Sequence, residues 1–592
     1  MSPIRIEPCR IERRVVAGEA TGWSDAVHPV LRRVYAARGV LEPGAVEHRL
    51  QRLSPPNLGG IEQACALLAG MIAEDRRIVV VGDFDCDGAT ATVVAVRGLR
   101  LLGAQHVTYR VPNRVLHGYG LSPALVATLA DPAPDLIVTV DNGIASHAGV
   151  AAARARGIRV LITDHHLPGA ALPDADAIVN PKVIEEGGHG RRLLDPRAQD
   201  ARSNDSLDNL AGVGVMFYVL LALRAHLHKS DCDLATLLDL VALGTVADLV
   251  PLDYNNRILV AAGLKRVRSG RACAGVGALF EAAARDLLRA VAGDLAFAIA
   301  PRINAAGRLK DMSIGIECLL SDDRAHAAAL AERLSSINAE RRVIQGAMVE
   351  QAEAAIDGLT DVEAHGARGV VLYRADWHPG VVGLVASRLK DRLHRPVIAC
   401  APASEGSTEL RASARSIRGF HIRDALAAMD ARDPGLVLRF GGHAMAAGLS
   451  LTLDKLERLR TAFDLIAAER LAGDQLEPVL LSDGELAPGD FDLTLARTLR
   501  YAGPWGQGFA EPLFDNVFTV GSWRLVGAKH WRLRLIPAVC TTKPAQPLDA
   551  ILFDAPVDEP PPSCVRAAYQ LEIDEWNGHE RLRLLLRHIE PA

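Results

Sequence analysis

A run of four β-branched residues, followed at once by alternating aspartates, constrains this chain more than any other feature. Ile78 to Val81 form a continuous apolar run that suits a strand buried on both faces of a sheet. Asp83, Asp85 and Asp87 come directly after it, and apolar residues at helical spacing begin after Gly88. The aspartates therefore lie at a strand-to-helix turn. Like charges this close raise one another's pKa unless a cation or several donors compensate them, so we expect chemistry at this turn.

The stretch from Arg76 to Pro181 alternates short apolar runs with Ala-rich helical segments. Its strand candidates are RRIVVVG, HVTYRV, PDLIVTV, IRVLIT and DAIVN. This rhythm predicts a parallel sheet with helices on both faces. Such a sheet binds ligands beyond the carboxyl ends of its strands. Asp141 follows PDLIVTV there, and Asp164, His165 and His166 follow IRVLIT.

These acidic and imidazole side chains fall at one edge of the predicted sheet. An aspartate after a strand most often caps the next helix, and any one of Asp83, Asp141 or Asp164 alone would favour that interpretation. Together, carboxylates and imidazoles are the ligand set expected for Mn²⁺ or for a mixed Mg²⁺/Mn²⁺ site. The acidic ligands are too many for one ion, which indicates two ions.

The rest of the chain predicts further domains. The chain turns helical around residues 204–250, and a long amphipathic helix from about Arg324 to Ile356, whose apolar stripe is broken by Arg341, is typical of a connector between domains. A second strand-helix-strand unit follows, and after Pro478 strands separated by turns predict a small β-barrel. We expect four parts, namely residues 1–322, 323–357, 358–472 and 473–592.

Composition excludes several classes of protein. Of the 592 residues 49% are hydrophobic and 23% charged, which is ordinary for a folded protein. A net charge of −5 argues against a uniformly basic coat but permits a local basic groove. The nine cysteines form no CxxC pair, so neither a disulfide framework nor a zinc site is indicated. The start lacks a signal-peptide core and no apolar stretch could span a bilayer, so we expect a cytoplasmic protein that does not contact membranes.

Four segments carry a family resemblance. GDFDCDG, DNG, DHH and GTVADLVPL resemble the successive motifs of the DHH phosphoesterase superfamily. The remainder resembles the RecJ family of bacterial exonucleases, through VPNRVLHGYGL, AFAIAPRINAAGRL, WHPGVVGLVASRL, RASARSIRGFHI, GGHAMAAG and WGQGFAEPLF, in that order. Phe84 and Cys86 replace the family's usual Tyr and Ala in the first motif. By strand alternation we expect both side chains to point away from the acidic face without loss of activity.

The resemblance implies an α/β fold with a parallel-sheet DHH catalytic domain, a long connecting helix, a smaller α/β DHHA1 domain and a C-terminal OB-fold barrel. It also implies a set of catalytic residues, Asp83, Asp85, Asp87, Asp141, Asp164, His165, His166 and Asp248. All of these except Asp164 are implied metal ligands, although the sequence leaves open whether Asp164 and His166 contact an ion or orient a ligand.

The function implied is metal-dependent hydrolysis of single-stranded DNA from 5′ to 3′, releasing 5′-mononucleotides in recombination and repair. Two divalent cations, Mn²⁺ or Mg²⁺, would activate water and clamp the scissile phosphate. The implied partners are single-stranded DNA, a single-strand-binding protein and a DNA helicase, and the protein is expected to be a monomer.

Substrate contacts are implied in the same way. The small residues of RASARS and FGGH allow close backbone approach to a phosphate beside Arg and His, and PRINAAGR resembles residues that face the 5′ end. The implied contacts are Arg114, Arg302, Asn304, Arg308, Ser413, Arg415, Gly442 and His443. In the barrel, Lys529, His530 and Arg532 could line a groove that follows the DNA backbone, with Trp523 or Trp576 stacking on bases. For most of GAKHWRLRL the simpler interpretation is a barrel strand, with Trp531 and Leu533 inside.

Three other functions fit parts of this sequence less well. A smaller-substrate enzyme of the same superfamily would cleave short oligonucleotides, cyclic dinucleotides or pyrophosphate, but such enzymes are typically shorter and lack the barrel. A replication scaffold that has lost catalysis would bind DNA or a helicase without cutting. Retention of every candidate ligand from Asp83 to Asp248 favours an enzyme, because mutually repelling carboxylates have no use in a scaffold. An ATP-driven function is disfavoured because no GxxxxGK[ST] loop is present.

Overall fold

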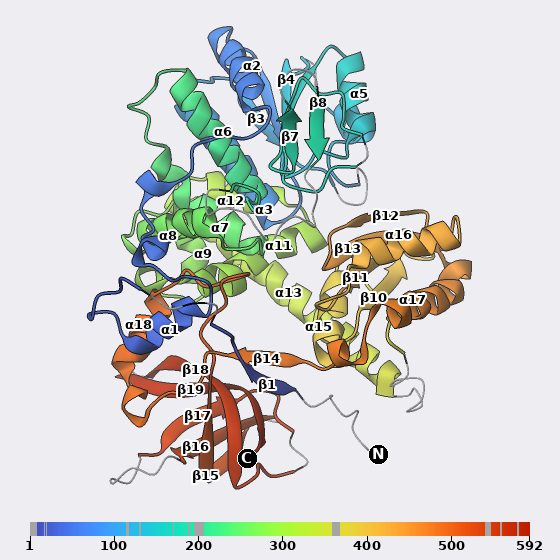
Figure 1. Ribbon diagram of the computed structural model, residues 1–592. Coiled ribbons are helices and arrows are strands. Elements are labelled where there is room, and N and C mark those ends of the chain that lie inside the picture. The colour runs from blue at the N-terminus through green and yellow to red at the C-terminus, as the bar shows by residue number, and fades with distance from the viewer. Residues whose placement is uncertain are drawn as a thin grey trace. The chain divides into compact units, whose positions relative to one another are not determined.

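The computed structural model describes residues 9–16, 18, 21–113, 118–129, 132–169, 171–186, 190–193, 206–357, 367–527, 529–538, 546–556, 559–576 and 579–592 (Figure 1). The chain folds into two compact units, each assembled from stretches far apart in the sequence. The sheet unit comprises Val16–Asn338 and Arg497–Glu511. The barrel unit comprises Met1–Val15, Ala339–Ala496 and Pro512–Ala592.

A five-stranded parallel sheet, in the order β3-β2-β4-β5-β6, forms the centre of the sheet unit. Its strands are β2 (Ile78–Val81), β3 (Val107–Arg110), β4 (Leu136–Val140), β5 (Arg159–Thr163) and β6 (Ala177–Val179). Val79 lies opposite Ile137, which lies opposite Val160. Every residue of β2 and β4 is buried because helices cover both faces, which explains their uninterrupted apolar sequence. The predicted parallel sheet is confirmed, strand by strand.

Helices pack on both faces of this sheet. One face is covered by α4 (Pro123–Ala127) and α5 (His147–Ala155), and the other by α2 (Ile61–Ala73), α3 (Cys86–Leu101) and α6 (Gly212–His226). The unit also contains α1 (Pro29–Ala36), α7 (Leu238–Ala247), α8 (Tyr254–Arg268), α9 (Ala274–Ala282), α10 (Ala292–Asp294), a π-helical turn (Leu295–Ile299), α11 (Ala300–Leu309), α12 (Ser313–Leu320), the 3₁₀ helices Pro43–Val46, Leu50–Arg52, Leu234–Leu237 and Leu287–Arg289, and a hairpin of β7 (Val183–Glu186) and β8 (Gly190–Leu193). The predicted long helix is α13 (Arg324–Asp357), which leads from this unit into the other (Figure 1).

The barrel unit contains a mixed sheet in the order β12-β13-β11-β10-β9. Its elements are β9 (Val370–Tyr373), α15 (Val382–Leu393), β10 (Val397–Pro402), β11 (Glu409–Arg415), α16 (Ile422–Arg432), β12 (Arg439–Gly442), β13 (Ala446–Thr452), α17 (Leu456–Arg470) and the 3₁₀ helices Leu453–Lys455, Gly473–Leu476 and Pro488–Asp490. β9 and β10 pair in parallel, with α15 as the crossover between them, so the predicted strand-helix-strand unit is confirmed.

The C-terminal strands close into a barrel in the order β15-β16-β17-β19-β18. They are β15 (Phe514–Val526), β16 (His530–Pro537), β17 (Leu548–Leu552), β18 (Cys564–Trp576) and β19 (His579–Pro591). The same unit pairs β1 (Arg10–Arg13) with β14 (Val479–Ser482) in parallel, and α18 (Leu493–Tyr501) precedes the barrel. Trp531 and Leu533 are buried on β16 while Arg532 and Arg534 are exposed, which confirms the predicted alternation.

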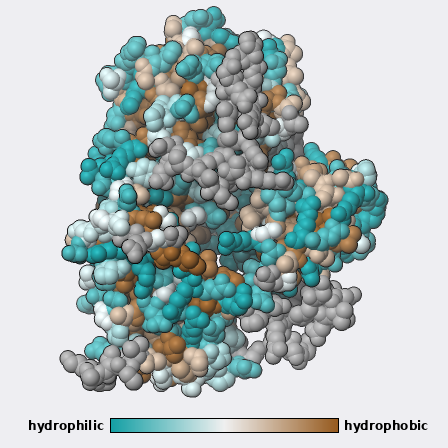
Figure 2. Space-filling view, in the orientation of Figure 1, coloured by the Kyte–Doolittle hydropathy of each residue, from teal (hydrophilic) through white to brown (hydrophobic). Residues whose placement is uncertain are grey.

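Hydrophilic side chains predominate on the face shown in Figure 2, where hydrophobic ones gather only in small separate groups. Among the described residues, no helix is both long enough and apolar enough to cross a membrane. The eight cysteines in the described part of the chain are free thiols, as expected from their scattered positions.

Candidate metal centre and substrate contacts

The first aspartates lie on a tight connection between β2 and α3. Asp85 caps α3 by accepting a hydrogen bond from the backbone N of Gly88 at 3.0 Å. Gly88 is packed directly against Asp83, so that a Cβ on Gly88 would lie 2.7 Å from the Asp83 backbone. Asp83 is buried at 4% exposure. The close packing holds both carboxylates on one short loop.

Asp87 has a second role that the sequence did not indicate. Its two carboxylate oxygens accept hydrogen bonds from the backbone N of Gly212, at 2.6 Å, and of Val213, at 2.9 Å. These are the first residues of α6, whose N-cap residue Ala211 has no side chain that could accept them. Burial and the neighbouring Asp85 charge raise the pKa of Asp87 to about 7, and the two backbone bonds oppose that rise. Asp87 therefore joins the acidic loop to α6.

Asp141 follows β4 in the left-handed backbone region, with φ of 61°, which Asp adopts more readily than most residues. The next residue, Asn142, donates hydrogen bonds from its side chain to the backbone O of Val81 at 3.0 Å and of Val140 at 2.8 Å. Asn142 thereby ties the ends of β2 and β4 together and fixes the spacing of the Asp83 and Asp141 loops. Nothing in the DNG segment predicts this role of Asn142 from sequence alone.

Asp164 organises the loop after β5. One carboxylate oxygen accepts from the backbone N of Ile144 at 2.9 Å, and the other accepts from the backbone N of His165 and of His166 at 2.7 and 3.1 Å. The second oxygen also lies 2.7 Å from Nδ1 of His166. Burial alone would raise the pKa of Asp164, but the His166 charge and these hydrogen bonds lower it to about 2. These contacts tie Asp164 to the loop after β4 and to the His166 ring.

Seven of the sequence-predicted residues converge at the carboxyl edge of the sheet. Three groups have ligand atoms within 4.8 Å of one another: Asp83, Asp85 and Asp141; Asp87, His165 and Asp248; and Asp141, His165 and His166. Among the described residues, Asp164 belongs to no such group. Nε2 of His165 lies 3.1 Å from Oδ1 of Asp141 and 3.5 Å from Oδ2 of Asp248.

The donor chemistry of this cluster fits divalent cations. Burial, followed by the charges of Asp87 and Asp85, raises the pKa of both Asp141 and Asp248 well above its ordinary value. The charged form of such carboxyl groups is destabilised unless a positive charge lies among them. Carboxylate oxygens suit hard cations and imidazole nitrogens suit transition metals, so the set matches Mn²⁺ and Mg²⁺.

Tyr119 borders the cluster, although no sequence pattern predicted it as a residue of the site. Its hydroxyl lies 3.4 Å from Nε2 of His166, and its ring packs edge-on against Phe84 at 5.8 Å between centroids. The alternation argument for Phe84 and Cys86 does not apply, because the strand ends at Val81 and α3 begins at Cys86. Phe84 lies instead beside a residue of the site.

Three of the predicted substrate residues, Arg302, Asn304 and Arg308, lie on α11. Oδ1 of Asn304 accepts a hydrogen bond from the backbone N of Cys86 at 2.7 Å, which joins α11 to the acidic loop. Arg302 donates to Oγ of Ser335 at 2.9 Å and to the backbone O of Ala282 at 3.3 Å, so its guanidinium holds helices together. Arg308 lies on the last turn of α11. Arg114 lies outside the described residues.

The other predicted substrate residues gather at one end of the mixed sheet in the barrel unit. Ser413 and Arg415 lie on one face of β11, and Arg415 donates to Oγ of Ser413 at 2.9 Å. Both lie over Gly383 at the start of α15, where a Cβ would come within 2.9 Å of each. Gly442 has φ of 143°. The backbone N of His443 donates a hydrogen bond to the backbone O of Ala446 at 2.8 Å, and Ala446 is paired with Arg415 between β13 and β11.

The predicted groove residues of the barrel have acidic or aromatic neighbours. Lys529 lies 3.8 Å from Asp554, and Arg532 lies 3.8 Å from Asp549. His530 accepts a hydrogen bond from the backbone N of Asp554. Trp523 is 44% exposed, while the side chain of Trp576 lies outside the described residues. These contacts reduce the positive charge that the predicted groove offers to DNA.

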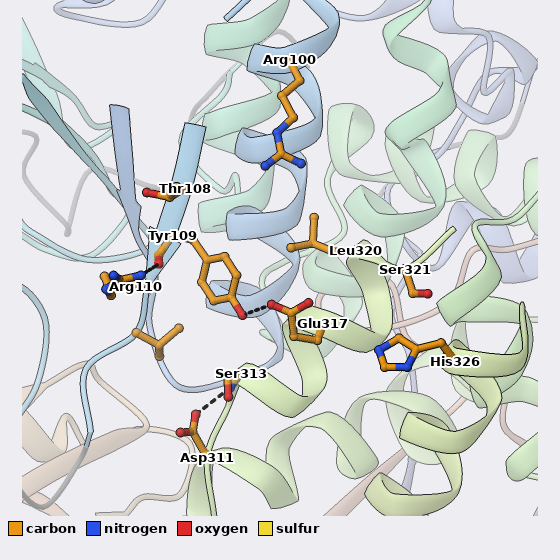
Figure 3. A pocket seen from close by; sticks show the side chains of 11 residues that line it. Arg100, Thr108, Tyr109, Arg110, Asp311, Ser313, Glu317, Leu320, Ser321 and His326 are labelled. Atoms are coloured by element: carbon orange, nitrogen blue, oxygen red, sulfur yellow. Dashed lines mark hydrogen bonds between the residues drawn. The ribbon is translucent and has the colours of Figure 1, made fainter. Parts of the chain in front are cut away.

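A separate hollow of about 660 Å³ lies beside the edge strand β3 (Figure 3). Arg100, Thr108, Tyr109, Glu317 and His326 are among its lining residues, and Tyr109 donates a hydrogen bond to Glu317 across it. None of the seven clustered residues lines this hollow. The hollow is therefore separate from the candidate metal centre at the edge of the sheet.

The sheet that gathers aspartates and histidines at its carboxyl edge lies in a stretch that matches the DHH family, so the protein belongs to the class of DHH phosphoesterases. Residues 77–245 match the family described as "DHH family, N-terminal domain", residues 366–469 the "DHHA1 domain", and residues 482–588 the "RecJ OB domain". The fold class implied by the resemblance is thereby confirmed.

Relatives that align with nearly the whole chain identify one family within this class. The chain is 46% identical to "Single-stranded-DNA-specific exonuclease RecJ" of Dickeya dadantii and 44% identical to that of Escherichia coli, and each alignment covers 98% of this chain and 99% of the relative. The crystal structure of RecJ in complex with Mn²⁺ from Thermus thermophilus superposes with a TM-score of 0.77 at 30% identity, covering 96% of this chain and 76% of that one. A structure of the same protein in complex with Mg²⁺ gives a TM-score of 0.72. The chain belongs to the RecJ family of single-stranded-DNA-specific exonucleases.

Proposed function

We propose that this exonuclease degrades single-stranded DNA from its 5′ end and uses two divalent cations, Mn²⁺ or Mg²⁺, held by Asp83, Asp85, Asp87, Asp141, His165, His166 and Asp248. The observation that carries the proposal is the convergence of these seven side chains in three groups whose ligand atoms lie within 4.8 Å. Two cations bound there would lower the pKa of a water molecule and offset the charge of the scissile phosphate.

The protein's own residues set the geometry of the reaction. Asp164 orients His166 through the 2.7 Å contact at Nδ1 and leaves Nε2 facing the cluster, beside the Tyr119 hydroxyl. Asn142 and the two bonds from Asp87 to α6 fix the loops that carry the carboxylates. These contacts would hold the loops in place before substrate binds, and pre-organised groups reduce the cost of reorganisation during a reaction.

We also propose a division of labour along the chain. Residues 1–322 would carry the hydrolytic centre, with Arg497–Glu511 as part of the same unit. Residues 323–357 would connect, 358–472 would hold the DNA backbone through Ser413, Arg415, Gly442 and His443, and the rest of 473–592 would extend the contact with the strand. By family membership we propose that the protein acts as a cytoplasmic monomer in recombination and repair, beside a single-strand-binding protein and a DNA helicase.

Replacing Arg415 by Ala is expected to raise KM for a 5′-phosphorylated single strand about 10-fold or more, with kcat changed less than about 3-fold. The reason is the loss of a charged hydrogen bond to phosphate, worth about 1.5–3 kcal/mol. Steady-state kinetics in Mn²⁺ would test it. Arg432→Ala is the matched control, since Arg432 forms an exposed ion pair with Glu469 at 2.8 Å and should leave KM unchanged. An unchanged KM in Arg415→Ala would remove this residue from the substrate path.

The function itself is tested by end-labelling. Purified protein is incubated with single-stranded or blunt duplex oligonucleotides labelled at either end, in Mg²⁺, Mn²⁺ or EDTA. We expect immediate release of labelled mononucleotide from the 5′ end of the single strand only, abolished by EDTA. Release first from the 3′ end would overturn the polarity, and tight binding without cleavage in either metal would favour the scaffold alternative.

A further inference from the structure

Phe297 is 76% exposed, although it lies between two fully buried residues, Leu295 and Ile299. The three belong to a π-helical turn, an arrangement found often at functional sites. Single exposed hydrophobic residues are common on protein surfaces and alone need no explanation. Phe297 differs because the turn that presents it continues directly into a helix that contacts the acidic loop.

That helix is α11, and its far end is packed against the loop of the candidate metal centre. Asn304 accepts the hydrogen bond from the backbone N of Cys86 at 2.7 Å. Gly307 allows the backbone O of Phe84 to come so close that a Cβ would lie 1.8 Å from it. Phe297 precedes Asn304 by seven residues, and the π-helical turn Leu295–Ile299 continues without a break into α11, so one run of helix carries both residues.

The surroundings fix the turn in place but do not cover the phenyl ring. Arg302 anchors α11 to Ser335 at 2.9 Å. Asp294, the acid just before the turn, accepts from the backbone N of Val291 at 3.0 Å and lies 3.8 Å from Arg285, so its charge is largely compensated. The backbone of the turn is therefore anchored while the ring stays exposed, and an exposed apolar ring costs free energy in proportion to its area.

We propose that Phe297 is a substrate-contact residue on which an unpaired base of the DNA strand stacks. The inference rests on the proposed function and adds a contact to it. Stacking on an aromatic ring is the usual sequence-independent contact to single-stranded DNA, since every base has a π-face. Bases inside a duplex do not offer that face, so the contact favours single strands.

The first test compares Phe297→Ala and Phe297→Trp with Leu288→Ala, a control at a residue that is 64% exposed in the same unit. Kd for an oligothymidylate is measured by fluorescence anisotropy in EDTA, and KM in Mn²⁺. We expect Phe297→Ala to raise both about 10-fold, Phe297→Trp to stay within about 2-fold of wild type, and the control to be unchanged. Equal values in wild type and Phe297→Ala would overturn the proposal.

The second test moves a single abasic site along the oligonucleotide. In the wild-type protein one position should raise KM most, and in Phe297→Ala the same position should cost nothing further, because the stacking partner is already missing. Additive penalties at every position would also overturn the proposal. If wild-type protein does not cleave single strands at all, the proposed function fails, whereas cleavage that is indifferent to Phe297 removes only this contact. Melting curves of each variant check the fold.

Discussion

Asp141→Asn is expected to lower kcat/KM on single-stranded DNA by about 10³-fold or more and, in EDTA, to raise the melting temperature of the protein. Asp141 belongs to two of the three candidate ligand groups, so its loss weakens both. A metal contact worth several kcal/mol corresponds to a rate effect of this size. Asn has the same shape and tolerates the left-handed backbone at this position, so the variant should fold.

The gain in stability follows from the pKa of Asp141. Burial, with the charges of Asp87 and Asp85, raises that pKa well above its ordinary value of about 3.9. Between those two pKa values the folded state binds a proton that the unfolded state has lost, so stability falls as pH rises. Asn has no such dependence. In EDTA the melting temperature of the variant should therefore exceed that of wild type by a margin that grows as pH rises above about 4.

Exonuclease assays over a range of Mn²⁺ concentrations and melting curves in EDTA would measure both effects. Asp174→Asn is the control, because the side chain of Asp174 is 90% exposed and should affect neither quantity. Wild-type turnover by Asp141→Asn at saturating Mn²⁺ would show that Asp141 is not a ligand. A lower melting temperature of Asp141→Asn in EDTA would show that groups of the protein itself already compensate the charge of the Asp141 carboxylate.

The strands of the sheet were predictable because their burial is uniform. A strand covered on both faces has no polar position, so the run at β2 could be identified from sequence alone, and parallel strands place their carboxyl ends at one edge. That topology explains why Asp83, Asp141 and His165 could be expected to meet. Asp248 is different, because it lies at the end of α7 and only the family resemblance pointed to it.

The contacts that were missed join residues remote in sequence. The bond from Asp87 to the start of α6 spans 125 residues, and the side chain of Asn142 reaches back 61 residues to β2. Local periodicity carries no information about such pairs, and an aspartate that caps a distant helix looks like any other. The π-helical turn that exposes Phe297 was missed for a related reason, since a single extra residue in a helix barely changes the apolar pattern.

The segment Arg497–Glu511 also packs against residues that are remote in sequence, which local patterns do not predict. The change to β-rich sequence after Pro478 suggested a boundary near residue 473, yet this segment is part of the sheet unit. The backbone N of Leu252 donates to Gln507 O at 2.7 Å, and Phe509, which is 2% exposed, packs under the guanidinium of Arg257 at 4.3 Å and beside Trp505 at 5.1 Å. The sheet unit thus includes a stretch of chain from the C-terminal region.

Phe509→Ala is accordingly expected to destabilise the protein by about 3–5 kcal/mol, because a buried ring is lost and a cation–π contact with it. The temperature at which exonuclease activity is lost should fall by about 10 °C, whereas kcat at 25 °C should stay near the wild-type value, since Phe509 is outside the acidic cluster. Thermal inactivation and differential scanning fluorimetry would measure the shift. Phe553→Ala is a matched control, because Phe553 is 50% exposed on the barrel and its loss should cost under about 1 kcal/mol. Equal shifts in the two variants would mean that the segment is an ordinary surface loop and that the sheet unit does not depend on it.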